Sequence, residues 1–453
     1  MGVVCNPYCR SQTMKTQLLL LAFAAVAMSG RAQSQSDTIT SATADQMHRD
    51  ALTQSTHVIS TGHTDLTTAE RKDSVQRLLN LFYLDQYRQF HDPEAPYFMF
   101  MTRDASFALG VGGMVMLRGW FDWNGSQDSY EFHPYNIAIP PNPAERHGLG
   151  ASLSQTSVFF TLLGHKNNLA YKVFVQIAAK NKDILLKKAY VTLNDFTIGL
   201  TSSTFEDGAA LVPSVDAEGP NGQISKTSVV GRYIHNFKSG WTVGGAVEFP
   251  SSSQNTVEGE TESCRDYVPD LIGLVQYGWN GGSSHVRLSG LLRNMSYRNL
   301  LAQRNHNVIG WGAQLSGVVN VVNPLTIYFS GAIGQGIGSY VGDLSEGAYD
   351  LVVEDGAPGK MVAPYNLGIT AGVRYDFTRN LFACVGFGET RNIERHGLAP
   401  DDYEYGLYGN VNLFWRITHR FLAGVEYIVG RRENFDGSHA PANRIDAMLS
   451  FSF

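Results

Sequence analysis

The chain has 453 residues, a formal net charge of −6 and a mean hydropathy of −0.15. Only 17 % of its residues are charged, against about 25 % in typical soluble domains, whereas aromatic residues reach 11 % and glycine occurs 46 times. This balance argues against a helical membrane protein and against an ordinary soluble enzyme, and the charge gives no reason to expect a nucleic-acid partner.

The N-terminal residues predict export. After Met14, a lysine precedes an apolar stretch over 18–28, and small residues follow up to Ala32, which is the pattern of a cleaved secretory signal. We therefore expect residues 1–32 to be a signal peptide whose true start is Met14. The apolar stretch is too short for a membrane-spanning helix, and no later stretch reaches about 18 consecutive apolar residues.

The following segment, residues 33–105, is expected to be a periplasmic extension. Its first part, up to residue 66, is polar and rich in Ser and Thr, which favours disorder. A capping-box pattern at Thr67–Glu70 then predicts a short helix over about residues 68–90, with its apolar residues on one face. The helix could pack under the next domain or join neighbouring subunits.

From about residue 106 to 453, apolar and polar residues alternate in segment after segment. Around Leu288, for example, apolar residues two positions apart oppose Arg287 and Arg293. A period of two predicts strands with one apolar and one polar face. We expect about sixteen such strands, each long enough to cross hydrocarbon when it is tilted.

The links between these segments alternate between short turns and longer polar stretches. The longer links are 123–149, 179–186, 202–223, 250–267, 295–306, 337–364, 392–401 and 431–442. This pattern predicts an all-β fold, a transmembrane antiparallel up-and-down β-barrel in a Gram-negative outer membrane. Only a closed sheet satisfies every backbone group in lipid, so the apolar face must point outward and the polar face inward.

The last alternating segment ends at Phe453. With both chain ends on the short-turn side, the final strand is expected to close the barrel. Outer-membrane barrels commonly end in such a phenylalanine, and this resemblance implies that the outer-membrane assembly machinery recognises Phe453.

Two sets of charged residues are candidates for the pore lining. The link 202–223 is expected to fold inward as a constriction loop, because sixteen strands would otherwise enclose a wide channel; the alternative is a solvated acidic outer loop. Its carboxylates are Glu206, Asp207, Asp216 and Glu218. The inward face of the strands carries the basic set, Arg118, Lys172, Lys188, Arg232, Arg287, Arg293, Arg374, Arg416 and Arg444.

Basic residues opposite a carboxylate loop would create a transverse field that filters charged solutes. Inward acids such as Asp122 and Glu426 are also expected, so each basic residue has two possible roles, structural pairing and solute contact.

Patterns for catalysis and metal binding are absent from the sequence. The glycine-rich runs 110–113 and 334–338 lack the strand-to-helix context of a phosphate loop, and no Gly-x-Ser-x-Gly motif or Cys/His metal spacing occurs. We expect neither an enzyme nor a bound cofactor or metal. Cys264 and Cys384 lie in unrelated contexts and do not indicate a disulfide.

Four stretches resemble the DcaP-like trimeric outer-membrane porins, as a Gram-negative, Bacteroidetes-like variant. They are Leu186–Asp207, Ala217–Gly222, Val230–Pro250 and Pro269–Asn299, with a Glu-Gly-Pro in the third loop and a late Gly-Leu-Leu-Arg. The resemblance implies a sixteen-stranded homotrimer that passes small anionic solutes such as dicarboxylates. It also implies that inward basic residues near the narrowing carry the anion preference, and Lys188, Arg232 and Arg293 match these best. The family's N-terminal coiled coil is shortened here.

The predicted function is passive diffusion of small hydrophilic, anionic solutes across the outer membrane. The alternative is a non-conducting barrel that acts as a surface receptor or adhesin through its extracellular loops, chiefly 250–267 and 337–364. A barrel enzyme is a weaker possibility. A TonB-dependent transporter is excluded, because it would need about 22 strands and a plug domain.

Overall fold

The computed structural model describes residues 56–60, 68–83, 88–103, 106–127, 129–166 and 169–453. All of them fall within one of the two units into which the chain divides, Ile39–Phe453. The predicted signal peptide and most of the polar stretch that follows it lie outside the described residues, as does Thr67 of the predicted capping box.

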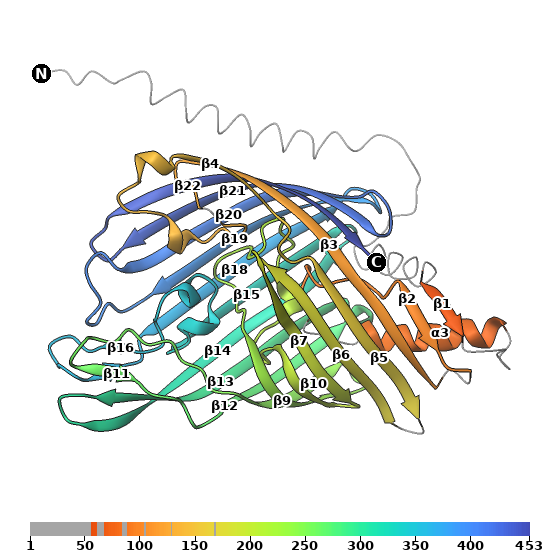
Figure 1. Ribbon diagram of the computed structural model, residues 1–453, viewed down its shortest axis with the longest axis horizontal. Helices are drawn as coiled ribbons and strands as arrows, with labels where there is room; N and C mark the ends of the chain where they lie inside the picture. Colours follow the sequence, from red (N-terminus) through yellow and green to blue (C-terminus); the bar gives the residue numbers. More distant parts are fainter. Residues whose placement is uncertain (1–55, 61–67, 84–87, 104–105, 128, 167–168) are drawn as a thin grey trace, which may run out of the picture. The chain divides into compact units, whose positions relative to one another are not determined.

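A closed antiparallel β-barrel makes up most of this unit (Figure 1). The strands of its wall are β3 (Phe107–Trp123), β4 (His147–Ser152), β5 (Ser157–Lys166), β6 (Leu169–Lys180), β7 (Asp183–Leu193), β8 (Phe196–Ser202), β9 (Thr227–Asn236), β10 (Trp241–Glu248), β12 (Asp270–Trp279), β13 (Ser284–Asn299), β14 (Arg304–Val322), β15 (Leu325–Gln335), β18 (Tyr365–Asp376), β19 (Leu381–Asn392), β20 (Tyr403–Arg416), β21 (Phe421–Asn434) and β22 (His439–Ser452). Because β4 and β5 pair with successive parts of β3 and count as one wall strand, the ring has the sixteen strands that the alternation predicts.

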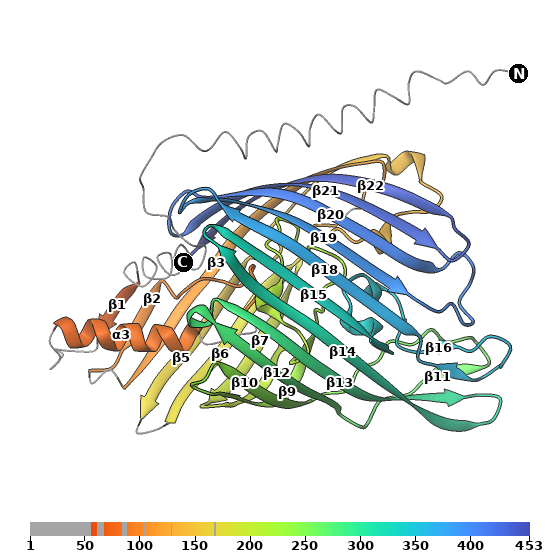
Figure 2. The ribbon, with the colours of Figure 1, turned by 180° about the vertical axis from the view of Figure 1, so that it is seen from behind.

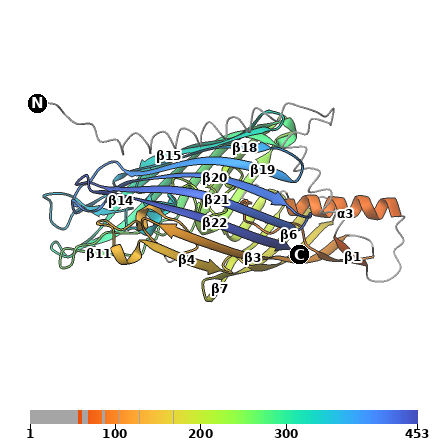
Figure 3. The same ribbon diagram turned by 90° about the horizontal axis from the view of Figure 1, so that it is seen from above.

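The last strand closes the ring as expected. β22 pairs with β3 from Asn443 opposite Trp123 to Ser452 opposite Met114, and Figures 2 and 3 show the two strands side by side. Phe453 and Gly113 then exchange two backbone hydrogen bonds, at 2.8 and 2.9 Å. A Cβ at position 113 would lie 2.7 Å from the Phe453 ring, so the approach requires a glycine.

The predicted orientation of the two faces is confirmed. On β13, Leu288 is 59 % exposed on the outer surface while the side chain of Arg287 is fully buried. On β21, Val425 is 52 % exposed and Glu426 is buried. An apolar outer surface around a polar interior is the arrangement that a barrel needs in lipid.

Three links that the sequence predicts to be long are tight turns in the structure. β6 and β7 are separated by two residues, and the strand pairs β13–β14 and β21–β22 continue to Asn299–Arg304 and Asn434–His439. At the ends of β13–β14 and β21–β22 the alternation is lost because the strands carry polar residues on both faces, although the backbone ladder continues. At the start of β7 it is lost because Ile184, Leu185 and Leu186 are apolar in a row. The predicted loops 179–186, 295–306 and 431–442 are therefore wrong in extent.

The remaining long links carry only short elements. These are β11 (Thr261–Ser263), β16 (Val352–Val353), β17 (Met361–Val362) and the 3-10 turns η1 (Pro134–Asn136), η2 (Pro143–Glu145), η3 (Gly208–Ala210), η5 (Gly338–Tyr340) and η6 (Asp343–Glu346). A further 3-10 turn, η4 (Asn280–Gly282), lies in the short connection between β12 and β13.

The residues before the barrel extend its sheet at the short-turn end. β2 (Phe98–Met101) pairs with β3 below the end of β22, and β1 (His57–Ser60) pairs with β2 in parallel. Helix α3 (Thr68–Tyr83) lies beside these strands (Figure 1). The helix ends earlier than the sequence predicts, because residues 88–90 are not helical.

Helix α3 covers an apolar part of the barrel's inner surface. Its residues Val75, Leu78, Leu79 and Phe82 form one buried cluster with inward-facing residues of β5, β6 and β7, namely Phe159, Leu163, Phe174 and Tyr190. Phe82 stacks on Phe159 at a ring-centroid distance of 5.3 Å. The interior is therefore not polar throughout, and the helix occupies the place where it is apolar.

Among the described residues, no helix has both the length and the apolar character needed to cross a membrane.

Candidate pore constriction

The link between β8 and β9, residues 203–226, runs through the inside of the barrel; we call it the constriction loop. Phe205 and Asp216 are fully buried, and Glu206 and Asp207 are only 1 % and 3 % exposed. The loop therefore does not lie as a solvated outer loop. Its burial depends on hydrogen bonds to the inward faces of distant strands.

The first half of the constriction loop is attached to β13 and β14. The carboxylate of Asp207 accepts hydrogen bonds from His285 Nε2 at 2.8 Å and from Ser316 Oγ at 2.7 Å. Arg287 donates from Nη1 to the carbonyl oxygen of Glu206 at 2.8 Å. Charge-assisted bonds of this kind are stronger than neutral ones, so this part of the loop is held firmly.

The second half is attached to the opposite part of the wall. Glu426 on β21 accepts bonds from the backbone N–H of Val215 at 2.9 Å and from Ser214 Oγ at 2.8 Å. Arg118 on β3 donates from Nε to the carbonyl oxygen of Val215 at 2.7 Å. The loop thus crosses the lumen between two anchored ends.

The links at the long-loop end pack onto the constriction loop from the other side. The backbone N–H of Phe132 donates to Asp216 Oδ1 at 3.0 Å. Asp343, in the link 337–364, accepts from Asn221 Nδ2 at 2.9 Å and from Tyr403 OH at 2.7 Å. Much of this link is buried in the interior, including Tyr340 and Val341, whereas the residues of the link 250–267 are exposed or half-buried, apart from Thr261.

Each of the nine basic candidates has a protein partner in this structure. Arg444 makes a bidentate pair with Asp122 at 2.6 and 3.0 Å, and Arg374 pairs with Asp376 at 2.7 Å. Arg293 lies between two buried carboxylates, Asp270 at 3.2 Å and Asp350 at 3.1 Å. The others bind Val215 (Arg118), Phe82 (Lys172), Asp92 (Lys188), Ser202 (Arg232), Glu206 (Arg287) and Arg379 (Arg416).

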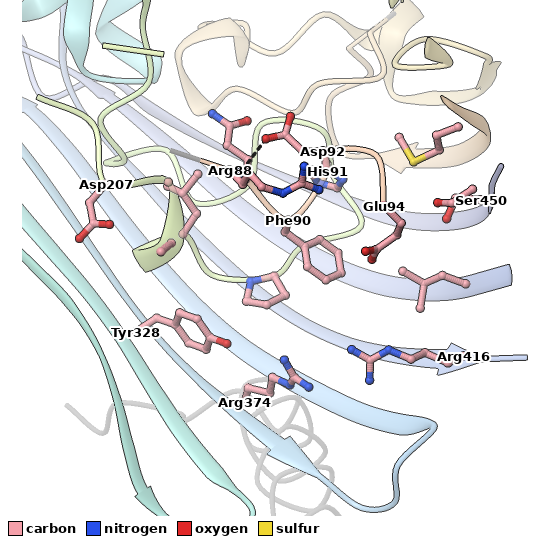
Figure 4. A pocket seen from close by; sticks show the side chains of 18 of the residues that line it. Arg88, Phe90, His91, Asp92, Glu94, Asp207, Tyr328, Arg374, Arg416 and Ser450 are labelled. Atoms are coloured by element: carbon pink, nitrogen blue, oxygen red, sulfur yellow. Dashed lines mark hydrogen bonds between the residues drawn. The ribbon is translucent and has the colours of Figure 1, made fainter. Parts of the chain in front are cut away.

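A cavity of about 750 Å³ lies on the short-turn side of the constriction loop. It brings together four of the thirteen predicted residues, Asp207, Arg287, Arg374 and Arg416. Figure 4 shows Tyr328, Arg374 and Arg416 around this cavity, with Phe90 and His91 facing it from a different part of the chain.

Burial changes the acidity of the constriction loop. It raises the pKa of Glu206 and of Glu218 to about 7 and that of Asp216 to about 6. Burial acts in the same direction on Asp207, but the Arg287 guanidinium together with His285 and Ser316 outweighs it, so the pKa of that carboxyl lies below its usual range. The loop therefore combines one ionised carboxylate with three carboxyls that take up protons near neutral pH.

Residues 156–428 match the family model described as a porin subfamily. The match covers more than half of the chain, and it falls on the barrel whose constriction is described above. This chain is a porin. It is therefore a channel of the outer membrane rather than an enzyme.

A solved outer-membrane channel shares its fold. The outer membrane channel DcaP of Acinetobacter baumannii aligns with a TM-score of 0.66 at 17 % identity, over 77 % of this chain and 98 % of that chain. Salmonella typhi OmpF, in complex with daunomycin, gives 0.49 at 9 % identity over 77 % and 98 % of the two chains. No curated protein sequence matches this porin. The predicted membership among DcaP-like porins agrees with the family model and with the fold of DcaP.

Sequence reasoning missed part of the cavity of this porin. Residues 88–92 and Glu94, which we expected at the end of the helix and in the extension that follows it, contribute to its lining, as does Arg420 from the turn between β20 and β21. The sequences of three wall strands did indicate that another segment covers their inner face. Phe159, Phe174 and Tyr190 are aromatic at positions that the alternation assigns to the inner face, so something apolar had to cover them.

Proposed function

We propose that this porin lets small hydrophilic anions, of the size and charge of dicarboxylates, diffuse passively across the outer membrane. The observation that carries the proposal is the charge of the cavity on the periplasmic side of the constriction. Its lining contains five arginines, Arg88, Arg287, Arg374, Arg416 and Arg420, against three carboxylates, Asp92, Glu94 and Asp207. A cationic excess inside a low-dielectric wall raises the local concentration of anions.

The structure favours some basic residues over others for this role. Arg287, Arg374 and Arg416 line the cavity. Arg293 does not, and its two buried carboxylate partners neutralise it. We therefore assign the anion preference to the first three residues, and we assign to Arg293 a structural part in holding the link 337–364.

Replacing Arg416 tests this assignment. Arg416 lines the cavity and donates from Nη1 to the carbonyl oxygen of Arg379 at 3.4 Å, whereas Arg374 forms an ion pair with Asp376 at 2.7 Å. Arg416→Gln should lower the anion-to-cation permeability ratio by about twofold, because it removes one positive charge from the lining. The ratio is obtained from the reversal potential of the reconstituted protein in a salt gradient.

The matched control is Lys238→Gln, which removes a positive charge from an exposed turn outside the cavity lining. An equal shift in both variants would show that overall charge, rather than the cavity, sets the permeability ratio.

We also propose that this porin is a homotrimer. One region of the wall supports this. The strand β4 pairs only with β3 among the described strands. The β6–β7 turn contacts the residues that follow β4, because the N–H of Asn181 donates a hydrogen bond to Ser154 Oγ at 2.8 Å. The exposed apolar side chains in this region, on β4, just after it and at the start of β7, are Leu149, Leu153, Ile184, Leu185 and Leu186. An apolar patch beside an unpaired strand edge favours contact with another subunit.

The native mass of the detergent-solubilised protein tests the trimer. We expect three times the monomer mass for the wild type and a shift to monomers for the double variant Leu149→Glu and Ile184→Glu, because two charges would be buried in each contact. A wild-type mass equal to one chain would contradict the proposal.

A further inference from the structure

The lumen of this porin holds a second segment besides the constriction loop. Residues Arg88–Pro96, which join the region of α3 to β2, lie inside the periplasmic half of the barrel; we call them the luminal segment. Ala95 is fully buried and Asp92 is 7 % exposed. Figure 4 shows Phe90, His91 and Asp92 beside the wall residues of the cavity.

The luminal segment spans the barrel from one wall to the other. Counted from β3 as the first wall strand, β7 is the fourth, and β19 and β20 are the thirteenth and fourteenth. On the β7 side, Lys188 Nζ pairs with Asp92 Oδ2 at 2.9 Å. On the far side, the Phe90 ring packs against Phe414 and Phe382, with centroid distances of 5.1 and 6.4 Å. Two residues apart in sequence, Phe90 and Asp92 thus bind walls that face each other.

The segment also binds the constriction loop directly. Gln89 Nε2 donates to Glu206 Oε1 at 2.6 Å, and His91 Nε2 donates to the carbonyl oxygen of Asp216 at 3.1 Å. Glu206 and Asp216 lie on the two halves of the constriction loop. The luminal segment and the constriction loop therefore form one hydrogen-bonded layer across the lumen.

Charge keeps the Asp92 contact in place over a wide pH range. Burial works against ionisation of this carboxyl, but the ammonium groups of Lys188 and Lys187 outweigh burial and hold its pKa well below the usual range. A buried ion pair is costly to break one partner at a time. The attachment is thus specific rather than a loose contact.

The ends of the segment are tied to the periplasmic rim. On one side, α3 is packed on the inner wall through Phe82 and its neighbours. On the other side, Arg420 lies over the Tyr97 ring at 4.5 Å, and Thr56 Oγ1 donates to the carbonyl oxygen of Pro96 at 3.1 Å. A segment fixed at both ends can leave the lumen without leaving the protein.

We propose that the luminal segment is a tethered periplasmic plug, which closes the channel in the state shown and must move out of the lumen for solutes to pass. This inference rests on the proposed function, since a plug has a role only in a barrel that conducts. The proposal assigns control of channel opening to residues that precede the barrel, in addition to the narrowing that the constriction loop provides.

Single-channel recording in planar bilayers tests the plug with two variants of the full-length protein. In the first, a Gly/Ser linker of equal length replaces residues 88–96 and leaves α3 and β2 in place. In the second, Phe90→Ala and Asp92→Asn together remove the two wall contacts with minimal change. The control is Asp73→Asn, which alters an exposed ion pair on α3. Folding is checked by the heat-dependent shift in electrophoretic mobility.

We expect the wild type and Asp73→Asn to stay mostly closed, with brief openings, and both plug variants to raise the time-averaged current by about tenfold or more. Equal currents from the wild type and a correctly folded plug variant would overturn the plug while leaving the channel intact. No current from any of them would overturn the proposed function itself, and the gate with it.

Discussion

Arg444→Ala should destabilise the barrel by about 3–5 kcal/mol, the usual cost of removing one partner from a buried ion pair. Arg444 and Asp122 are both fully buried and form two hydrogen bonds across the β22–β3 seam that closes the ring. The variant would leave Asp122 and the neighbouring Asp446 as unpaired buried carboxylates. Urea unfolding, followed by the loss of the folded band in unheated gels, measures the change.

A paired replacement separates charge from packing. Asp122→Asn combined with Arg444→Met removes both members of the pair and keeps most of the volume, so it should recover a large part of the stability lost in Arg444→Ala. If the double variant were as unstable as Arg444→Ala, lost packing rather than the unpaired carboxylate would explain the effect.

The channel current should rise as the pH is increased from about 5 to about 8. In the packed constriction loop, burial raises the pKa of Glu206 and of Glu218 to about 7, above the ordinary value of 4.5. Their contribution to loop packing is therefore fully present below about pH 4.5 and is lost as the pH rises through about 7. Asp216, with a pKa of about 6, acts in the same direction.

The charged groups that face these carboxyls do not reverse the predicted rise of the current with pH. Glu206 lies near Gln89, Lys188, Lys226 and Asp92, and Glu218 near His133, Glu131, Gln223 and Asp216. Although burial opposes its charged form, His133 has a pKa well above its ordinary value because it binds Asp343 and Glu131. Its stabilising charge is therefore also present at low pH and lost at high pH. Asp92 and Glu131, whose pKa values are held below their usual range, stay ionised from pH 5 to 8. Burial lowers the pKa of Lys226 to about 8, so its loss of charge acts in the opposite direction, but only at the upper end of this interval.

The double variant Glu206→Gln and Glu218→Gln provides the control, because amides carry no charge at any pH. Its current should rise much less with pH than that of the wild type, measured in planar bilayers at constant salt, because only Asp216 and His133 still titrate in the same direction. A wild-type current that falls with rising pH, or a double variant that keeps the full pH dependence, would contradict this account.

The barrel itself could be predicted from sequence because lipid and water impose a simple rule on every strand. Leu288 and Arg287 illustrate it, since a strand residue in this environment has only two choices of face. The inward course of residues 203–226 also agrees with the expectation, which came from the width of a sixteen-stranded ring. The orientation of the strand faces and the inward course of the loop can both be predicted without knowing which residues contact each other.

The roles of the charged residues could not be predicted in the same way. Periodicity places Arg293 and Arg374 on the inner face, but it does not show that Arg293 also meets Asp350 from the link 337–364, beside Asp270 on the neighbouring strand, while Arg374 lines a cavity. Pairing depends on where the long links fold. The alternation within the strands carries no information about that.

The luminal segment was missed for a related reason. Residues 88–96 have no periodicity and are rich in polar residues and proline, so by themselves they read as the end of a helix and a linker. Only the inward aromatic residues of the wall, such as Phe174 and Phe414, indicate that something must cover them.

The reversal potential of the wild-type protein in a gradient of potassium chloride tests the central claim most directly. Current through the openings should reverse close to the chloride equilibrium potential, because the arginine-rich cavity admits anions in preference to cations. Reversal near the potassium potential, or a folded protein that never conducts, would contradict the account.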